Sequence, residues 1–152
     1  MIDAELDRDP TDQGQRYAAG ARAARPTAEG KTEAWARIVE DPHTPLATIR
    51  SLIANFGRFD QTELIEPYRP RYFASIEPMW NSRPVEVAVT FVDGMYPLAL
   101  MGPDLITETD AYLEAHKDAA PPVRRYLIEN RDDAARALNA RALDAAAGAA
   151  GE

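Results

Sequence analysis

Residues suited to recognition gather between positions 68 and 80. Their shared feature is a mixture of arginine with large aromatic side chains, and the candidate contact residues are Tyr68, Arg69, Arg71, Tyr72 and Trp80, with Phe73 among them. Guanidinium groups form paired hydrogen bonds with carboxylates, and aromatic side chains anchor interfaces. One interpretation is contact with a peptide or a neighbouring domain. The other is that the aromatic residues pack in the core while the arginines form an exposed face.

Patterns for metal binding and nucleophilic catalysis are missing. The two histidines are His43, in a proline-flanked turn, and His116, near an expected helix end. They lie too far apart in sequence to form a pair of metal ligands on one helix. No serine lies in a nucleophile elbow, and no glycine-rich phosphate loop precedes Lys31 or Lys117. The sequence therefore predicts no catalytic residue and no metal ligand in this chain.

Neighbouring acidic residues are common, as expected for a chain with 25 of them. The pairs are Glu63 with Glu66, Glu108 with Asp110, and Asp132 with Asp133. Helix capping and solvated faces account for such pairs without an acid–base role.

The composition narrows the possible partners and compartment. The chain has 152 residues, a net charge of -8 and no cysteine. An acidic chain lacks the clustered positive charge that nucleic-acid binding requires, and the missing cysteines exclude disulfides and thiolate zinc sites. No segment has the length and hydrophobicity of a signal peptide or a membrane span. We expect a cytoplasmic protein with neither nucleic acid nor membrane as a partner.

Capping residues and prolines predict helices that hold the candidate residues. Helix starts are predicted at Asp9, Thr27, Thr44 and Asp60, because each is followed by a proline or an acidic residue that suits a first turn. The segment after Thr44 carries apolar residues at helical spacing and ends at Gly57, a residue common at helix C-termini. Pro67 and Pro70 cannot both lie within one straight helix. We therefore expect a break near Pro67 and a new helix through Trp80.

The segment Val85–Val92 fits two periodicities. Val85, Val87 and Val89 alternate as in a strand, whereas Val85, Ala88 and Val92 align as in a helix. A lone strand would leave its backbone groups unpaired, and no second strand is evident. We therefore predict a buried helix. Two further helices are expected, one through Leu105–Leu113 and one after Pro121.

Prolines that begin segments recur at intervals of one helix and a turn: Pro45, Pro67, Pro84, Pro103 and Pro122. This spacing predicts an all-α fold in which antiparallel helix pairs stack side by side. The expected architecture is a HEAT- or armadillo-like array, a segment of an α-solenoid.

Several stretches resemble a known family. They are DPTDQGQR, RPTAEGKTEAWARIVED, QTELIEPYRPRYFASIEPMW, VTFVDGMYP and TDAYLEAH. Together they resemble the helical C-terminal domain of bacterial zinc aminopeptidases of the aminopeptidase N family, which is similar to the C-terminal domain of endoplasmic-reticulum aminopeptidases. The resemblance runs from about Asp3 to Ala147. It implies a single helical domain over residues 1–147, incomplete on its N-terminal side, with a frayed tail at residues 148–152.

The resemblance also implies a function. In that family this region forms a bowl over the zinc-bearing domain and helps to enclose a chamber for peptides whose N-terminal residues are removed. The implied partners are the catalytic domain of the same parent chain and the peptide substrate. The family's His-Glu-x-x-His zinc motif and its exopeptidase motif have no counterpart here, so zinc would belong to the parent's catalytic domain and the chain would be inactive alone. The alternative is a free-standing helical-repeat module that binds a protein or peptide.

Overall fold

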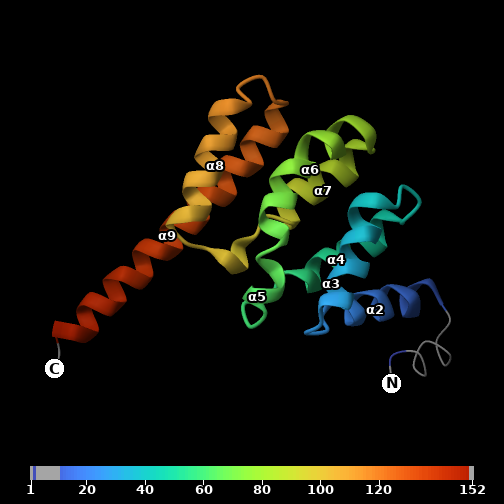
Figure 1. The fold of residues 1–152 in the computed structure, drawn as a ribbon, viewed down its shortest axis with the longest axis horizontal. Coiled ribbons are helices and arrows are strands. Elements are labelled where there is room, and N and C mark those ends of the chain that lie inside the picture. Colours follow the sequence, from blue (N-terminus) through green and yellow to red (C-terminus); the bar gives the residue numbers. More distant parts are fainter. Residues whose placement is uncertain (1, 3–10, 151–152) are drawn as a thin grey trace.

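The computed structural model describes residue 2 and residues 11–150, with side chains as far as residue 147. Within these residues every regular element is a helix (Figure 1). The elements are α2 Asp12–Ala23, α3 Ala28–Trp35, a π-helical turn η1 Ala36–Glu40, α4 Leu46–Phe56, α5 Thr62–Ile65, α6 Tyr68–Ser82, α7 Val85–Gly94, a 3-10 turn η2 Leu98–Leu100, α8 Pro103–Ala115 and α9 Pro121–Ala150. The all-α prediction is confirmed for this part of the chain.

Threonine side chains cap the first two described helices. The Thr11 side chain accepts a hydrogen bond from the Gly14 amide, and the Thr27 side chain accepts one from the Gly30 amide. These bonds satisfy amides that a helix start leaves without partners. The predicted helix start at Asp9 lies outside the described residues, whereas the predicted cap at Thr27 is confirmed.

Gly20 allows α2 to approach α4 closely. A Cβ atom at this position would lie 2.7 Å from the Ser51 Oγ and 2.8 Å from the Asn55 Nδ2. The Ser51 hydroxyl also donates a hydrogen bond of 2.8 Å to the Arg16 carbonyl, which ties the two helices together. Gly20 therefore offsets its low helix propensity with a close helix–helix contact.

The third predicted helix is present as α4. It buries Ile49, Leu52 and Phe56 on one face, and Gly57 follows as the C-cap. Gly57 has φ of -89°, a value open to any residue, so its position here does not depend on the conformational freedom of glycine.

The predicted break at Pro67 separates α5 from α6. The predicted helix start at Asp60 is wrong, because α5 begins at Thr62 and its N-cap is Gln61. The Asp60 carboxylate instead accepts a hydrogen bond of 3.0 Å from the Arg58 Nε. A charged partner two residues away thus replaces the backbone amides that a cap would bind.

The segment with two possible periodicities is helical and forms α7. Val87, Ala88, Phe91 and Val92 are buried, which is the helical face. Val85 is 55% exposed at the start of the helix. The strand alternative is therefore excluded, and the buried-helix prediction is confirmed.

Helices pack both against consecutive helices and against helices further along the chain. Helix α2 lies against α3 and α4, α7 contacts α6, α4 and α9, and α8 contacts α9. In Figure 1 the short turn between α8 and α9 places these two helices side by side in opposite directions, and the second half of α9 projects from the rest of the molecule. Helix α9 extends to Ala150, and the expected fraying of residues 148–152 stays a prediction. No helix in the described ranges is long and apolar enough to cross a membrane.

Three basic side chains bind helix C-termini. The Lys31 Nζ donates to the carbonyls of Ala23 and Phe56, the last residues of α2 and α4, at 2.7 and 2.8 Å. Arg83 binds the end of η1 through the carbonyls of Val39 and Asp41. Arg124 binds the end of α8 through the carbonyls of Leu113 and His116. Cations at these ends satisfy free carbonyls and oppose the negative end of the helix dipole.

Candidate functional site

Two of the predicted contact residues lie in the aromatic core. The ring of Tyr68 packs 5.2 Å from Trp35 and 5.1 Å from Phe56, centroid to centroid. Tyr72 is 1% exposed, and its hydroxyl donates a hydrogen bond of 2.5 Å to the Val92 carbonyl. Burial raises the pKa of Tyr72 well above its ordinary value. Both tyrosines therefore stabilise the packing of α6 against its neighbours.

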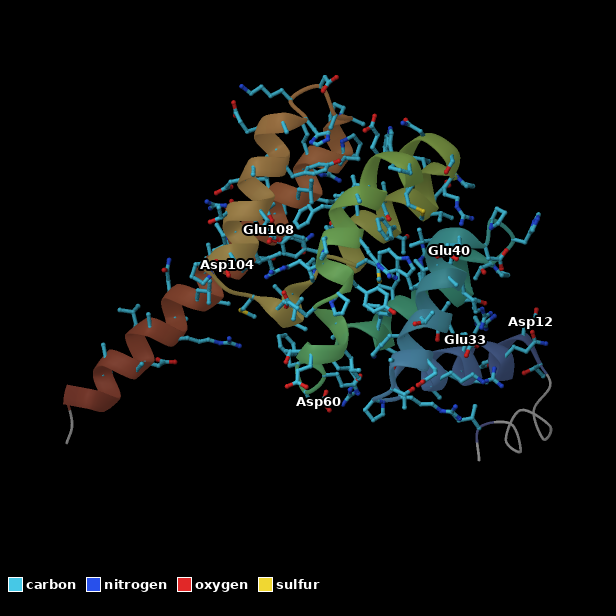
Figure 2. The ribbon with its side chains drawn as sticks, viewed as in Figure 1. Asp12, Glu33, Glu40, Asp60, Asp104 and Glu108 are labelled. Atoms are coloured by element: carbon cyan, nitrogen blue, oxygen red, sulfur yellow. The ribbon has the colours of Figure 1, made fainter. Side chains whose placement is uncertain are left out.

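The two arginines of the cluster have different surroundings. Arg69 forms ion pairs with Glu66 at 2.8 Å and with Glu108 at 3.3 Å, so it links α6 to α8. Figure 2 labels Glu108 on α8. Arg71 is exposed, and its guanidinium carbon lies 5.3 Å from the centre of the Tyr68 ring. Arg71 is thus the member of the cluster whose charge remains open to a partner.

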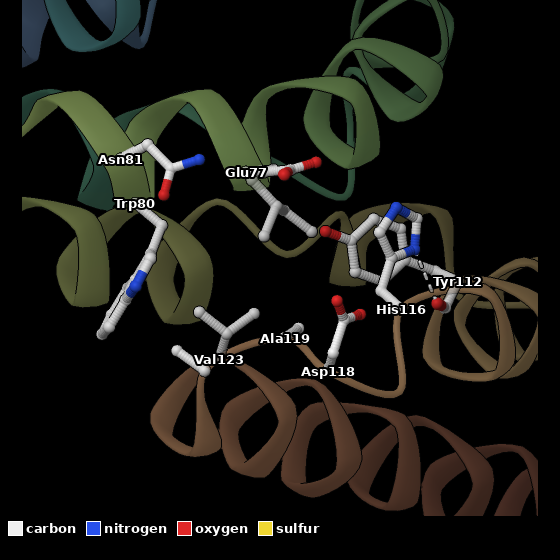
Figure 3. Close-up of a pocket in the computed structure, with 10 residues that line it drawn as sticks. Glu77, Trp80, Asn81, Tyr112, His116, Asp118, Ala119 and Val123 are labelled. Atoms are coloured by element: carbon white, nitrogen blue, oxygen red, sulfur yellow. Dashed lines mark hydrogen bonds between the residues drawn. The ribbon is translucent and has the colours of Figure 1, made fainter.

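Trp80 lies apart from Tyr68 and lines a pocket of about 290 Å³. The pocket is lined by residues of α6, the end of α8, the turn after it and the start of α9: Ile76, Glu77, Trp80, Asn81, Tyr112, His116, Asp118, Ala119, Ala120 and Val123. Figure 3 shows Trp80 at one end and Tyr112 with His116 at the other, with Glu77 and Asp118 on opposite sides. The structure therefore separates Trp80, which lines this pocket, from Tyr68 and Tyr72 in the packed core and from the exposed Arg71.

An aromatic stack closes one end of the pocket. The rings of Tyr112 and His116 lie 4.0 Å apart between centroids with an interplanar angle of 15°. The His116 Nδ1 is 2.9 Å from the Tyr112 backbone oxygen, which can only accept, so Nδ1 is the donor. Burial, and then the nearby Glu77 carboxylate, raise the pKa of the Tyr112 hydroxyl. The stack forms a polar and aromatic wall of the pocket.

Comparison with known proteins decides the family. The family model described as "ERAP1-like C-terminal domain" matches residues 1–136. The chain belongs to the ERAP1-like C-terminal domain family. It is also 43% identical, over 146 residues, to the aminopeptidase N of Streptomyces lividans. That match covers 96% of this chain and 17% of the Streptomyces protein, so the chain spans a small part of that relative's length.

The described part of this ERAP1-like domain offers no metal centre. It holds no group of three or more His, Cys, Asp or Glu side chains placed to bind a metal ion. His43 is exposed in the turn before α4, and His116 is the C-cap of α8, where the sequence placed it. The described residues do not fit a zinc site.

The sequence did not reveal the pocket of this ERAP1-like domain. Among its lining residues the sequence predicts a contact role for Trp80, while Tyr112 lies within the expected helix Leu105–Leu113 and His116 lies near its end. The pocket brings together α6 and the α8–α9 turn, which are far apart in sequence. A local signal was available only at the turn, where His116, Lys117 and Asp118 place polar groups between two helices.

Proposed function

We propose that the chain serves as a non-catalytic domain of a zinc-dependent aminopeptidase N, which removes N-terminal residues from peptides. The observation that carries this proposal is the 43% identity to an aminopeptidase N across 96% of the chain. Zinc and the residues of hydrolysis then belong to a catalytic domain in the same parent chain. The contribution of this domain is to help enclose the chamber that admits peptides.

The helix packing supports an extension of this proposal to a HEAT-like array. Helix α7 contacts both α4 and α9, while α6 and α8 each pack against the next helix in the chain. A stack of this kind buries apolar faces only between neighbours and leaves a broad surface for a partner. Such a surface is suited to the wall of a peptide chamber.

The exposed charge of Arg71 supports a role in peptide or interdomain contact. Within the cluster, Tyr68, Tyr72 and Arg69 hold Arg71 and α6 in place through core packing and ion pairs. In the parent enzyme, Arg71→Ala should raise the KM for peptides and leave kcat within about twofold, because the residue binds without taking part in the reaction. Arg50→Ala, an exposed arginine on α4, is the matched control. An unchanged KM in Arg71→Ala would remove this contact from the proposal.

A free-standing helical-repeat module that binds a protein or peptide is the alternative. The same surface would serve it, so the two proposals differ in the polypeptide that carries the domain. Copurification of an aminopeptidase activity with this domain supports the first, and its absence supports the second.

A further inference from the structure

The pocket beside Trp80 has the size of a site for a single side chain. Its volume of about 290 Å³ lies at the lower end of the range of small-molecule pockets, roughly 300–1,000 Å³. It is built from helices that are fixed by other contacts, since Arg69 links α6 to α8 and Arg124 binds the end of α8. The pocket is therefore preformed, which lowers the entropic cost of binding.

The charges that face the pocket are negative. Glu77 and Asp118 contribute carboxylates from two separate parts of the chain, and the lining contains no lysine or arginine. Elsewhere in the described chain, carboxylates such as Glu66, Glu108 and Asp110 have arginine partners. No ion pair is formed by Glu77 or Asp118 with a described residue. Both carboxylates are thus available to a cation that enters the pocket.

The ends of the pocket suit the same kind of group. The indole of Trp80 stands at one end and the Tyr112–His116 stack at the other, as Figure 3 shows. Aromatic faces attract guanidinium and ammonium groups, and tryptophan does so most strongly. Ala119 and Val123 supply an apolar floor for the methylene groups of a long side chain. The lining therefore combines the aromatic, apolar and acidic groups that suit a basic side chain.

We propose that this pocket binds the side chain of an arginine or lysine residue of a peptide. The proposal rests on the proposed function, because a chamber wall is where a peptide side chain would meet the domain. It would give the enzyme a preference for peptides with a basic residue away from the bond that is cleaved.

The test uses the purified chain labelled with ¹⁵N and two small probes. Nα-acetyl-arginine amide carries the cation, and Nα-acetyl-norleucine amide is a neutral comparator of similar length. The signal is the indole N–H resonance of Trp80, one of two tryptophans, which Trp80→Phe assigns. The charge-removing variant combines Glu77→Gln with Asp118→Asn. The matched control combines Glu33→Gln with Glu40→Gln, two exposed carboxylates on α3 and η1 (Figure 2).

We expect a saturable shift of the Trp80 signal with the arginine probe and a weaker one with the norleucine probe. The charge-removing variant should bind the arginine probe about fivefold more weakly, because it loses ionic contacts with two exposed carboxylates. The control variant should bind as the wild type does. An absent shift, equal affinity for both probes, or unchanged affinity in the charge-removing variant would overturn the proposal. These measurements test binding by the purified chain alone. A negative result here therefore differs from a failure to find this domain within an aminopeptidase, which would overturn the proposed function.

Discussion

Replacing Lys31 with methionine should weaken the fold more than its position on a charged, polar helix suggests. Lys31 is fully buried, and its ammonium donates to the last carbonyls of both α2 and α4. The ammonium also lies 5.4 Å from the centre of the Phe56 ring. Methionine keeps the apolar stem and removes the donor. Two helix ends then lose a shared cation, and the carbonyls of Ala23 and Phe56 lose a partner inside the protein.

The magnitude follows from opposing contributions. Hydrogen bonds from a charged donor contribute roughly 1.5–3 kcal/mol each, so two amount to about 3–6 kcal/mol. The variant also avoids the unfavourable free energy of burying an ammonium group, and this gain offsets part of the loss. We expect a net loss of about 2–4 kcal/mol in the free energy of unfolding. For a chain of this length that corresponds to a fall in Tm of roughly 5–12 °C.

The assay is urea and thermal unfolding of the purified chain at neutral pH. Lys117→Met is the matched control, because Lys117 is the other lysine of the chain and pairs on the surface with Glu114. Loss of an exposed pair should change stability by less than about 1 kcal/mol. If the free energy of unfolding of Lys31→Met stays within about 0.5 kcal/mol of the wild-type value, the bonds from Lys31 to the two helix ends do not stabilise the fold.

The pH dependence of the free energy of unfolding, compared between the wild type and Lys31→Met, gives an independent test of Lys31. Burial lowers the pKa of Lys31 below its ordinary value of 10.5. Between the lowered pKa and 10.5, the unfolded chain binds more protons at Lys31 than the folded chain does, so Lys31 makes stability rise with pH. The stability difference between wild type and Lys31→Met should therefore grow as the pH approaches 10.5. A constant difference would mean that folding leaves the pKa of Lys31 unchanged.

Three further predictions test the packing. Gly20→Val should lower the free energy of unfolding by about 1–3 kcal/mol in chemical denaturation, because the valine side chain would collide with Ser51. Gly57→Ala should change it little, since a Cβ at that position meets nothing within 4 Å. Equal losses in the two variants would refute the close approach of α2 to α4. Tyr72 should make the free energy of unfolding fall as pH rises past about 10, because its hydroxyl stays neutral in the folded chain and ionises on unfolding. In unfolding measured as a function of pH, Tyr72→Phe should show a shallower fall than the wild type. The same slope in the two proteins would contradict this prediction. Arg124→Met should speed amide hydrogen exchange at the end of α8 and leave exchange in α2 to α4 unchanged. Equal exchange rates at the end of α8 in wild type and variant would argue against Arg124 as a cap of that helix.

Features set by local residues could be predicted from the sequence. The apolar stripe of α4, the Thr27 cap and the break at Pro67 each depend on residues within one turn of one another. The helical state of Val85–Val92 was predicted from its helical neighbours, because a helix satisfies its own backbone while a lone strand does not. These elements needed no knowledge of the tertiary structure.

Features that depend on distant partners could not be predicted. Lys31 looks like any exposed lysine until α2 and α4 bring their C-termini to it. The helix predicted to start at Asp60 has Gln61 as its N-cap, and the Asp60 carboxylate binds Arg58 instead of the helix amides. Tyr68 and Trp80 are close in sequence, yet one packs in the core and the other lines a pocket with the α8–α9 turn. Sequence spacing alone does not say which side of α6 meets which neighbour.

Immunoprecipitation from a lysate of the source cells, with an antibody raised against this chain, tests the central proposal most directly. The precipitated polypeptide is measured for apparent mass and for release of N-terminal residues from peptides, with and without a zinc chelator. We expect a polypeptide several times larger than 16.8 kDa with aminopeptidase activity that the chelator abolishes. A polypeptide of 16.8 kDa without that activity would contradict the account and favour a free-standing binding module.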